Sequence, residues 1–406
     1  MRVLLSAYGC EPNKGSEQEI GWQRALHMPA FADEVWVLTR SNNRTVIEED
    51  PLSRTSGLHF IYYDLPQWAI RLKKRSWFFP IYLVLWQWGA YRTALRHHKQ
   101  RRFDRVYHVT FTGLVAGSLM GRLGIPFVVG PIAGGERAPF ALRRGMPFLC
   151  RVRESIRDLG IIIQRYSPLS YPALAAAERI YVVTQDSLRL VPAKWHFKTE
   201  VQLSVGHSSE ISWQPERRSS SSPQFVFAGR LLHWKGVHFA IRALAEARRR
   251  VPTATLTLFG SGPSERWLRD LAKKCGVADA VDFAGQAPRQ KLIDSLHSFT
   301  ALVFPSLHDS GGLAVLEAMS KGLPVVCLDL GGPGIMVNGS CGVVVPTAGA
   351  DEAQVVTGIA NAMIRLGSMS PVEFERLSRG AVNRANDLTW AKLTERVAYC
   401  ESEQRI

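Results

Sequence analysis

The feature that most constrains the fold is a regular alternation of strand-like and helix-like segments along the chain. Short runs rich in β-branched and aromatic residues are separated by longer segments of mixed polarity. This alternation predicts parallel strands joined by crossover helices, because a parallel strand can be reached only through a long connection. The first six runs are RVLLSA, EVWVLT, LHFIYY, RVYHVT, PFVVGP and RIYVVT.

A polar stretch, QPERRSSSSPQ, interrupts this pattern, and the pattern then starts again. The second set of runs is FVFAGR, TLTLFG, VDFAG, ALVFPS, PVVCLDL and GVVVPT. A chain of 406 residues is also longer than one core usually serves. We therefore expect an α/β protein with two doubly wound, Rossmann-like domains over 1–213 and 224–386, and a linker over 214–223. Ligands of such sheets bind beyond the carboxyl ends of the strands, which predicts a site in a cleft where the domains face each other.

The charge is uneven along the chain. The net charge is +15, and the first 208 residues hold 28 of the 50 basic and 16 of the 35 acidic side chains, which gives +12 for that half. A basic half indicates an anionic partner, such as nucleic acid, phosphates or an acidic membrane. Six cysteines without a CxxC pair suit a reducing cytosol, and we see neither a signal peptide nor a run long enough to span a bilayer.

The stretch HDSGGLAVLEAM, from His308 to Met319, allows three interpretations. Its Asp-Ser-Gly-Gly core is similar to the nucleophile segment of serine proteases, which would make Ser310 a catalytic residue, but no matching histidine segment accompanies it. Alternatively, the glycine pair opens a helix after a strand, and its free N–H groups form a phosphate site. Glu317 would then need a partner, such as a sugar hydroxyl. The third interpretation is a helix capped by Asp309 or Ser310, with Glu317 facing solvent.

The segment GRLLHWKGVHFAIRAL places two cations, Arg230 and Lys235, beside a strand-to-helix turn. Two cations at such a turn can clamp a diphosphate and neutralise charge as it leaves. They can also be ordinary surface residues.

These segments occur in the order seen in glycosyltransferase family 4, which the chain resembles. That family contains retaining, nucleotide-sugar-dependent enzymes of the GT-B fold. The resemblance rests on Gly229-Arg230 with Trp234-Lys235-Gly236, Phe259-Gly260-Ser261-Gly262-Pro263, Val281-Asp282-Phe283-Ala284-Gly285, Pro305-Ser306, and Asp309 to Met319 with Gly322-Leu323-Pro324-Val325.

The first half resembles a subgroup associated with bacterial exopolysaccharide or lipopolysaccharide assembly. The matching segments are Gly15-Ser16-Glu17 with Gly21-Trp22, Tyr107 to Phe111, and Gly130 to Gly135. The segment around Trp390 resembles the helix with which such chains close, crossing back to the first domain, so we expect this helix over 387–406.

The resemblance implies roles for individual residues. It implies that Glu317 holds the ribose, and that Arg230 and Lys235 bind the diphosphate. His108 would contact the donor sugar, although a histidine at a strand end can also be satisfied internally. The remaining donor-binding residues would be Gly15, Ser16, Gly260, Gly262, Gly311, Gly312, Leu313 and Ala314, of which Gly15-Ser16 also fits an ordinary turn and cap.

One position departs from the family pattern. The family usually has two glutamates eight positions apart, and the first of these is Asp309 in this chain. Its carboxylate falls short by one carbon–carbon bond, ~1.5 Å. We therefore expect Asp309 to act in catalysis and to influence which donor sugar is used.

A separate stretch, from Arg71 to Arg102, brackets an aromatic-rich apolar run with basic clusters. This pattern is typical of a helix in a membrane interface, with Lys73, Lys74, Arg75 and Trp77 as the membrane or acceptor patch. A core helix with basic ends and an RNA-binding segment are the alternatives.

The sequence thus predicts a retaining glycosyltransferase that moves a hexose from a nucleotide diphosphate sugar to a glycan or lipid-linked acceptor, with no nucleic-acid partner. It would act in the cytoplasm, on the inner face of a bacterial membrane with an anionic surface. No D-x-D pair or metal-ligand cluster occurs in the sequence, so we expect neither a metal nor another cofactor. The alternatives are a non-catalytic basic binding protein on a degenerate transferase fold and a serine hydrolase using Ser310.

Overall fold

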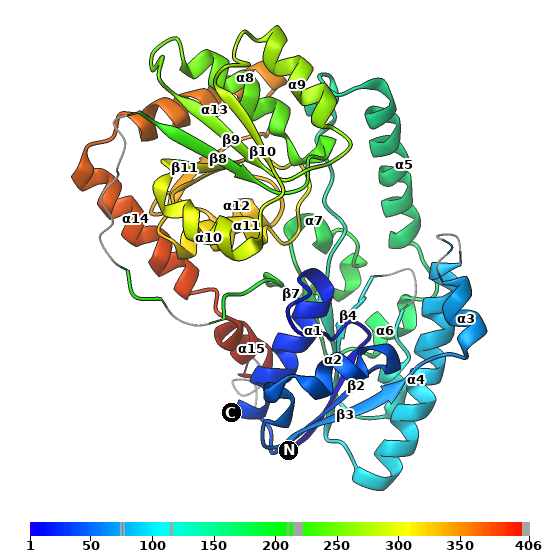
Figure 1. Cartoon of the computed structure of the whole chain (residues 1–406). Coiled ribbons are helices and arrows are strands. Elements are labelled where there is room, and N and C mark those ends of the chain that lie inside the picture. The colour runs from blue at the N-terminus through cyan, green and yellow to red at the C-terminus, as the bar shows by residue number, and fades with distance from the viewer. Residues whose placement is uncertain (74, 76–77, 114–116, 209–210, 214–221, 400–406) are drawn as a thin grey trace. The chain divides into compact units, whose positions relative to one another are not determined.

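The computed structural model describes residues 1–73, 75, 78–113, 117–208, 211–213 and 222–399. The chain divides into two compact units, each built on one parallel sheet (Figure 1). Unit 1 comprises Met1–Gly135, Leu159–Val205 and Trp390–Ile406, and unit 2 comprises Glu136–Asp158 and Gly206–Thr389. The sequence placed 136–158 in the first domain, whereas these residues contact mainly the second sheet's unit. Most of the expected linker, 214–221, lies outside the described residues.

Within the described residues, the sheet of unit 1 has seven parallel strands in the order β3-β2-β1-β4-β5-β6-β7. The order reverses between β1 and β4, which places a topological switch point there. The strands are β1 Arg2–Ala7, β2 Glu34–Arg40, β3 Leu58–Tyr63, β4 Arg105–Thr110, β5 Phe127–Ile132, β6 Arg179–Val182 and β7 Thr199–Val201.

Alternate residues of these strands point into two separate cores, as the period of two in a strand requires. Leu4 belongs to the core that contains Trp86, and its neighbours Val3 and Leu5 belong to the core that contains Trp22. The α-helices that begin in unit 1 are α1 Ser16–His27, α2 Arg44–Glu49, α3 Gln67–Leu72, α4 Phe79–Arg101, α6 Tyr171–Ala176, α7 Gln185–Leu188 and α15 Trp390–Tyr399. Its short 3₁₀ helices are η1 Met28–Ala30, η2 Ser41–Asn43, η3 Pro51–Arg54, η4 Met120–Leu123 and η6 Ala193–Lys198.

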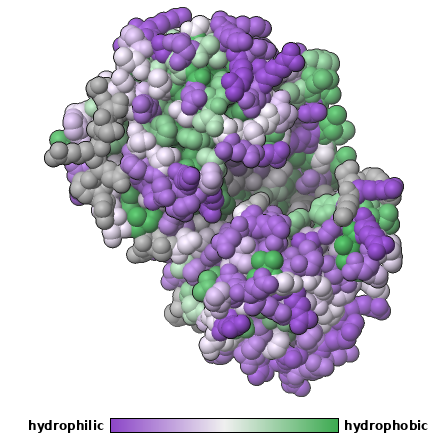
Figure 2. Space-filling model, viewed as in Figure 1, coloured by the Kyte–Doolittle hydropathy of each residue, from purple (hydrophilic) through white to green (hydrophobic). Residues whose placement is uncertain are grey.

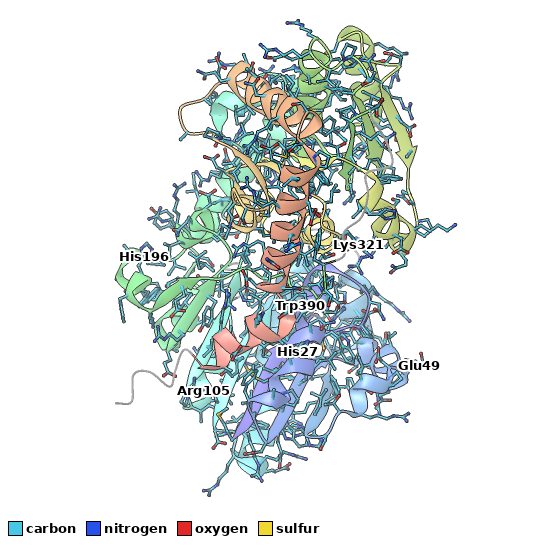
Figure 3. All side chains as sticks on the ribbon, turned by 90° about the vertical axis from the view of Figure 1, so that its left-hand side faces the viewer. His27, Glu49, Arg105, His196, Lys321 and Trp390 are labelled. Atoms are coloured by element: carbon cyan, nitrogen blue, oxygen red, sulfur yellow. The ribbon has the colours of Figure 1, made fainter. Side chains whose placement is uncertain are left out.

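The closing helix α15 lies against α1, as the labels of Trp390 and His27 in Figure 3 show. The guanidinium of Arg24 on α1 donates a hydrogen bond to the carbonyl of Leu393 at 3.0 Å. The side-chain amide of Gln202 donates to the same carbonyl at 2.7 Å. These contacts explain why the last helix belongs to unit 1 although it follows unit 2 in sequence.

The sheet of unit 2 has six parallel strands in the described part, in the order β10-β9-β8-β11-β12-β13. They are β8 Gln224–Ala228, β9 Thr255–Phe259, β10 Val281–Gly285, β11 Ala301–Phe304, β12 Val325–Leu328 and β13 Gly342–Val345. The α-helices are α8 Val237–Ala247, α9 Glu265–Lys274, α10 Arg289–Ser295, α11 Leu313–Ser320, α12 Gly331–Met336, α13 Glu352–Gly367 and α14 Pro371–Asn386, and the 3₁₀ helices are η5 Phe140–Arg143, η7 His233–Lys235 and η8 Leu296–Ser298.

The helices of unit 2 cover both faces of its sheet, with α8, α9 and α13 on one face and α10, α11 and α12 on the other (Figure 1). A long helix, α5 Phe148–Arg165, begins in unit 2 and ends in unit 1. The two doubly wound sheets that the alternating sequence predicts are therefore confirmed.

The run that suggested a membrane-interface helix forms α4, which packs into the core of unit 1 through Tyr82, Leu83, Trp86 and Ala90. Most of the apolar side chains of α4 therefore lie in the core, as the alternative of a core helix with basic ends predicted. Of the expected patch, Lys74 and Trp77 lie outside the described residues, and Arg75 is exposed. The ammonium of Lys73 lies 4.8 Å from the centre of the Tyr82 ring, and burial lowers its pKa.

No helix in the described ranges combines the length and the apolar character that crossing a bilayer requires.

Candidate functional site

The loops after β8 and β11 meet in unit 2, where the strand order of its sheet reverses. β8 and β11 are hydrogen-bonded neighbours, and the next strands lie on opposite sides of this pair. The crevice beyond the carboxyl ends of such a pair is where open α/β sheets bind ligands. The first loop carries Arg230 and Lys235, and the second carries Asp309 and the glycine pair.

The two loops are joined by an ion pair between the ammonium of Lys235 and the carboxylate of Asp309. Both side chains are mostly buried, and the ammonium also lies 5.1 Å from the centre of the Phe304 ring. The other oxygen of Asp309 accepts a hydrogen bond from the N–H of Gly312 at 3.2 Å. Asp309 therefore fixes both the lysine and the turn that leads into α11.

The start of α11 is open to an anion. Gly312 is the N-cap residue, its φ is 70°, and no side chain caps the helix, so the expected cap by Ser310 does not form. The N–H groups of Leu313 and Ala314 donate to no other group among the described residues. Free N–H groups at a helix start attract negative charge.

Glu317 lies one turn into α11, and its partner is an arginine. Its Oε1 accepts a hydrogen bond from Nε of Arg289 on α10 at 2.7 Å. The side chain of Glu317 is 14% exposed and that of Arg289 is 65% exposed, so the carboxylate is sheltered by a solvent-facing cation. The sequence expected a sugar hydroxyl or solvent at this carboxylate and missed Arg289, because no spacing rule links the two positions.

A buried cluster lies behind these loops. The carboxylate of Glu154, on α5, contacts Nε2 of His233 at 2.8 Å and Nε2 of His308 at 3.1 Å. Burial would raise the pKa of Glu154, but hydrogen bonds from the two histidines outweigh this effect and hold it well below its ordinary value. His233 lies two residues before Lys235 and His308 directly precedes Asp309, so Glu154 ties both loops to one helix.

Nothing in the sequence pattern singled out Glu154, His233 or His308 in this role. The glutamate is 79 and 154 residues away from its partners. The ring of His308 also stacks on Trp234, with centroids 5.2 Å apart. Because the imidazole of His308 bonds Glu154, it is directed away from a catalytic pairing with Ser310. No hydrogen bond joins Ser310 to a histidine in the part of the chain that the structure describes.

Arg230 is exposed and forms no ion pair with any described residue. Its loop packs against the loop after β9, where a Cβ atom on Gly260 would lie 2.0 Å from the carbonyl oxygen of Gly229. A Cβ atom on Gly262 would lie 2.4 Å from the carbonyl oxygen of Leu231. These two glycines therefore allow two loops to pack closely, and their predicted contact with the donor stays a prediction.

The switch point of unit 1 holds the remaining predicted residues. His108 is buried near the end of β4, with Nδ1 3.2 Å from the hydroxyl of Ser6 and Nε2 3.5 Å from the amide nitrogen of Gln87. Burial lowers the pKa of His108 to about 4, so its imidazole is neutral at neutral pH. The internal partners match the alternative of a satisfied histidine, and a contact with the donor sugar stays a prediction.

Gly15 is the N-cap residue of α1, with a φ of 67° and open space where a Cβ atom would be. Ser16 begins the helix, which starts at the carboxyl end of β1 and beside β4. Glu17 accepts a hydrogen bond from the N–H of Phe111 at 3.0 Å, and burial raises its pKa. This bond ties the start of α1 to the loop that follows His108.

Histidine, cysteine and carboxylate side chains do not form a group of three or more that could hold a metal ion anywhere in the described ranges.

Solved structures align with nearly the whole chain. Anabaena Alr3699/HepE, solved in complex with UDP and glucose, aligns over 99% of this chain and 100% of that chain, with a TM-score of 0.58 and 15% identity. Sucrose-phosphate synthase from Thermosynechococcus elongatus aligns over 99% and 98%, with a TM-score of 0.62 and 18% identity. Identities this low establish the fold alone, and that fold is the predicted GT-B fold.

Residues 209–363, which lie in the second unit, match the family model described as "Glycosyl transferases group 1". The chain is 37% identical over 177 residues to a glycogen synthase of Mycobacterium tuberculosis, an alignment that covers 43% of this chain and 41% of that protein. It is 33% identical over 192 residues to a D-inositol 3-phosphate glycosyltransferase of Stackebrandtia nassauensis, covering 44% and 42%. The chain thus matches about two fifths of the length of these curated relatives.

Proposed function

We propose that this protein is a retaining glycosyltransferase that moves a hexose from a nucleotide diphosphate sugar to a glycan or lipid-linked acceptor. The observation that carries the proposal is the switch point of unit 2. An uncapped helix start, a lysine and an unpaired arginine meet there beside a sheltered glutamate. The match of this unit to the group 1 glycosyltransferases supports the same chemistry.

The diphosphate would bind at the start of α11, where the N–H groups of Leu313 and Ala314 are free to donate. Lys235 would neutralise the charge that develops on the leaving diphosphate, and Arg230 would close on it from the exposed side of the loop. Since neighbouring protein groups supply this positive charge, the proposal requires no metal and no other cofactor.

Glu317 would hold the ribose. Both of its contacts with Arg289 are made through Oε1, which leaves Oε2 to accept hydrogen bonds from ribose hydroxyls. Arg289 holds the carboxylate in a fixed orientation through these charge-assisted contacts. Glu317 would thereby orient the nucleotide, with its diphosphate lying over the helix start.

The retaining outcome follows from the resemblance to glycosyltransferase family 4. The acceptor oxygen bonds to the anomeric carbon on the face from which the diphosphate leaves, and the acceptor proton passes to a diphosphate oxygen. Such a step uses no protein nucleophile. It therefore suits a site whose described side chains stabilise charge, and in which Ser310 has no histidine partner.

The cellular setting is proposed from the resemblance of the first half to bacterial exopolysaccharide and lipopolysaccharide transferases. We place the enzyme in the cytoplasm, peripheral to the inner face of the cell membrane. Two curated relatives are named for glycogen and for inositol 3-phosphate. Soluble glucans and phosphorylated inositols therefore belong in an acceptor screen beside lipid-linked glycans.

Calorimetric titration with UDP and GDP, followed by transfer assays with the matching hexose donors, tests the proposal. We expect one nucleotide to bind and Glu317→Ala to weaken that binding about tenfold or more, through loss of charge-assisted hydrogen bonds to the ribose. The control is Glu265→Ala, a partly exposed carboxylate at the start of α9 that pairs with Arg269 on its own helix. Wild-type protein that binds neither nucleotide and releases none from any donor would rule the function out.

A further inference from the structure

Helix α5 has its polarity reversed relative to an ordinary surface helix. Its only glutamate, Glu154, is buried against the histidines of unit 2, and Ile161 is buried as well. Its other large apolar side chains face water: Leu149, Ile156 and Ile163 are 71%, 64% and 63% exposed. Figure 2 shows apolar surface along the edge of the molecule where α5 lies.

The exposed apolar residues form one continuous stripe. Leu149, Val152, Ile156, Leu159, Ile163 and Tyr166 succeed one another at steps of three and four residues, and all of them are exposed. Residues at this spacing lie on one face of an α-helix. Eighteen residues at about 1.5 Å each give a helix of roughly 27 Å, so the stripe runs the length of α5.

Arginines flank this stripe on both sides. Successive residues of a helix are turned by about 100°, so Arg151 and Arg153 lie about 100° to either side of Val152. Both are exposed, as is Arg165 at the end of the helix. The two acidic residues of α5 are already paired: Glu154 contacts its histidines, and Asp158 pairs with Arg143 at 2.8 Å. The charge that α5 presents around its apolar stripe is therefore positive.

We propose that α5 is a membrane-docking helix, which lies in the interface of an anionic lipid bilayer with its apolar stripe among the acyl chains. An interfacial helix combines an apolar face with flanking cations, whose long side chains reach lipid phosphates while their stems stay in the apolar layer. In a symmetric pair of chains, the arginine rows of the two copies would instead border the same contact. The charge pattern thus favours lipid over a second copy.

A cavity at the end of the stripe has matching chemistry. It has a volume of ≈ 560 Å³ and is lined by Tyr166, Pro168, Tyr171 and Leu174, with Arg165 among the residues that border it. The ammonium of Lys194 lies 4.3 Å from the centre of the Tyr171 ring. An apolar cavity beside cations suits the acyl chain and the charged headgroup of a lipid, which again favours lipid over protein as the occupant.

The proposed function places the enzyme at a membrane, and this surface would be the part of the protein that contacts it. The inference therefore rests on the proposed function. It also replaces the patch around α4, because α4 directs most of its apolar side chains into the core of unit 1. Lipid binding and sugar transfer are measured separately below, so that failure of one idea leaves the other standing.

The test is flotation of the full chain with vesicles of phosphatidylcholine alone or with 30 mol % phosphatidylglycerol, a composition chosen as about one third anionic. We expect binding to the anionic vesicles only. Leu149→Gln/Ile156→Gln/Ile163→Gln should reduce it by a factor of ten or more. Arg151→Gln/Arg153→Gln should reduce it several-fold at low salt and less at high salt, since screening weakens charge contacts. The matched control, Val46→Gln/Leu52→Gln/Val372→Gln, alters exposed apolar residues elsewhere and should bind as the wild type does.

Gel filtration and nucleotide titration establish that each variant is folded. Equal binding by the wild type and the α5 triple variant would overturn the proposal, and so would failure of the wild type to bind anionic vesicles. A triple variant that changes from dimer to monomer with its lipid binding intact would assign the stripe to a second copy. Transfer to a soluble acceptor should be unchanged in the triple variant. If the wild type binds vesicles but transfers no sugar, the docking surface stands and the proposed function fails.

Discussion

The two units have the same sheet design but place different chemistry at the point where the strand order reverses. In unit 2 the loops after β8 and β11 carry an ion pair, an uncapped helix start and a buried glutamate between two histidines. In unit 1 the corresponding position, at β1 and β4, holds His108, which burial keeps neutral. The comparison separates a unit whose switch point carries cations and a free helix start, which suit an anion, from a unit whose switch point offers neutral hydrogen bonds.

The largest effect on sugar transfer is expected from replacing Lys235 at the switch point of unit 2. Lys235→Ala should lower the rate of sugar transfer by about 10²–10³-fold, because it removes a cation aimed at developing negative charge. It also leaves Asp309 without its partner, so Lys235→Ala/Asp309→Asn should not be worse than the single variant. The control is Lys274→Ala on α9, and initial rates with the preferred donor measure the effect. Near-normal transfer by Lys235→Ala would remove unit 2 from the chemistry.

Loss of Glu154 should rank next. Removing this carboxylate leaves two buried histidines without their acceptor, a change that typically costs about 3 kcal/mol or more. Glu154→Ala should therefore lower the melting temperature of the protein and weaken nucleotide binding, whereas Glu154→Gln, which keeps one acceptor oxygen, should do both less. Differential scanning calorimetry with and without nucleotide measures this, and equal melting of all three proteins would contradict the tie between the loops.

The buried His108 of unit 1 should make the stability of the protein depend on pH in the acid range. The pKa of His108 is lowered from 6.5 to about 4 in the folded protein, so between these values the unfolded chain binds a proton that the folded chain excludes. The free energy of unfolding should therefore be unaffected by this histidine above pH 6.5. It should fall by about 3 kcal/mol as the pH is lowered from 6.5 toward 4. His108→Gln should flatten this dependence in urea unfolding at pH 7 and pH 5. An unchanged dependence would show that His108 is accessible to protons.

The smallest effect is expected at Arg289. Its pair with Glu317 is two-thirds exposed on the arginine side, and such pairs contribute about 0–1 kcal/mol. Arg289→Ala should raise KM for the donor no more than about fivefold and leave kcat unchanged. If kcat falls as strongly as in Lys235→Ala, then Arg289 contacts the donor itself and belongs with Lys235 among the charged residues that act in the reaction.

The architecture was accessible from the sequence because strand burial leaves a direct pattern. All twelve predicted runs coincide with observed strands. The start of α11 at Leu313 was also predicted, since a glycine pair after a strand marks it. The three-residue strand β7 was missed, because its partly buried residues carry too short a pattern.

Side-chain partners and helix orientation were not accessible in this way. Arg289 and Glu154 meet their partners through the tertiary fold, across separations that no periodicity records. The stretches that form α4 and α5 are both apolar and basic, but one is a core helix and the other exposes its apolar stripe. The deciding fact is that Glu154 finds two histidines, which turns the opposite face of α5 outward.

Because of Glu154, α5 belongs both to the proposed lipid-binding surface and to the support of the loops that carry Lys235 and Asp309. The helix whose outer face we assign to lipid holds, on its inner face, the residues that precede Lys235 and Asp309. If a bilayer shifts α5, the donor loops shift with it, and thermodynamic reciprocity then requires bound nucleotide to change lipid affinity by the same factor. Membrane binding and donor binding would then be thermodynamically coupled through the position of α5.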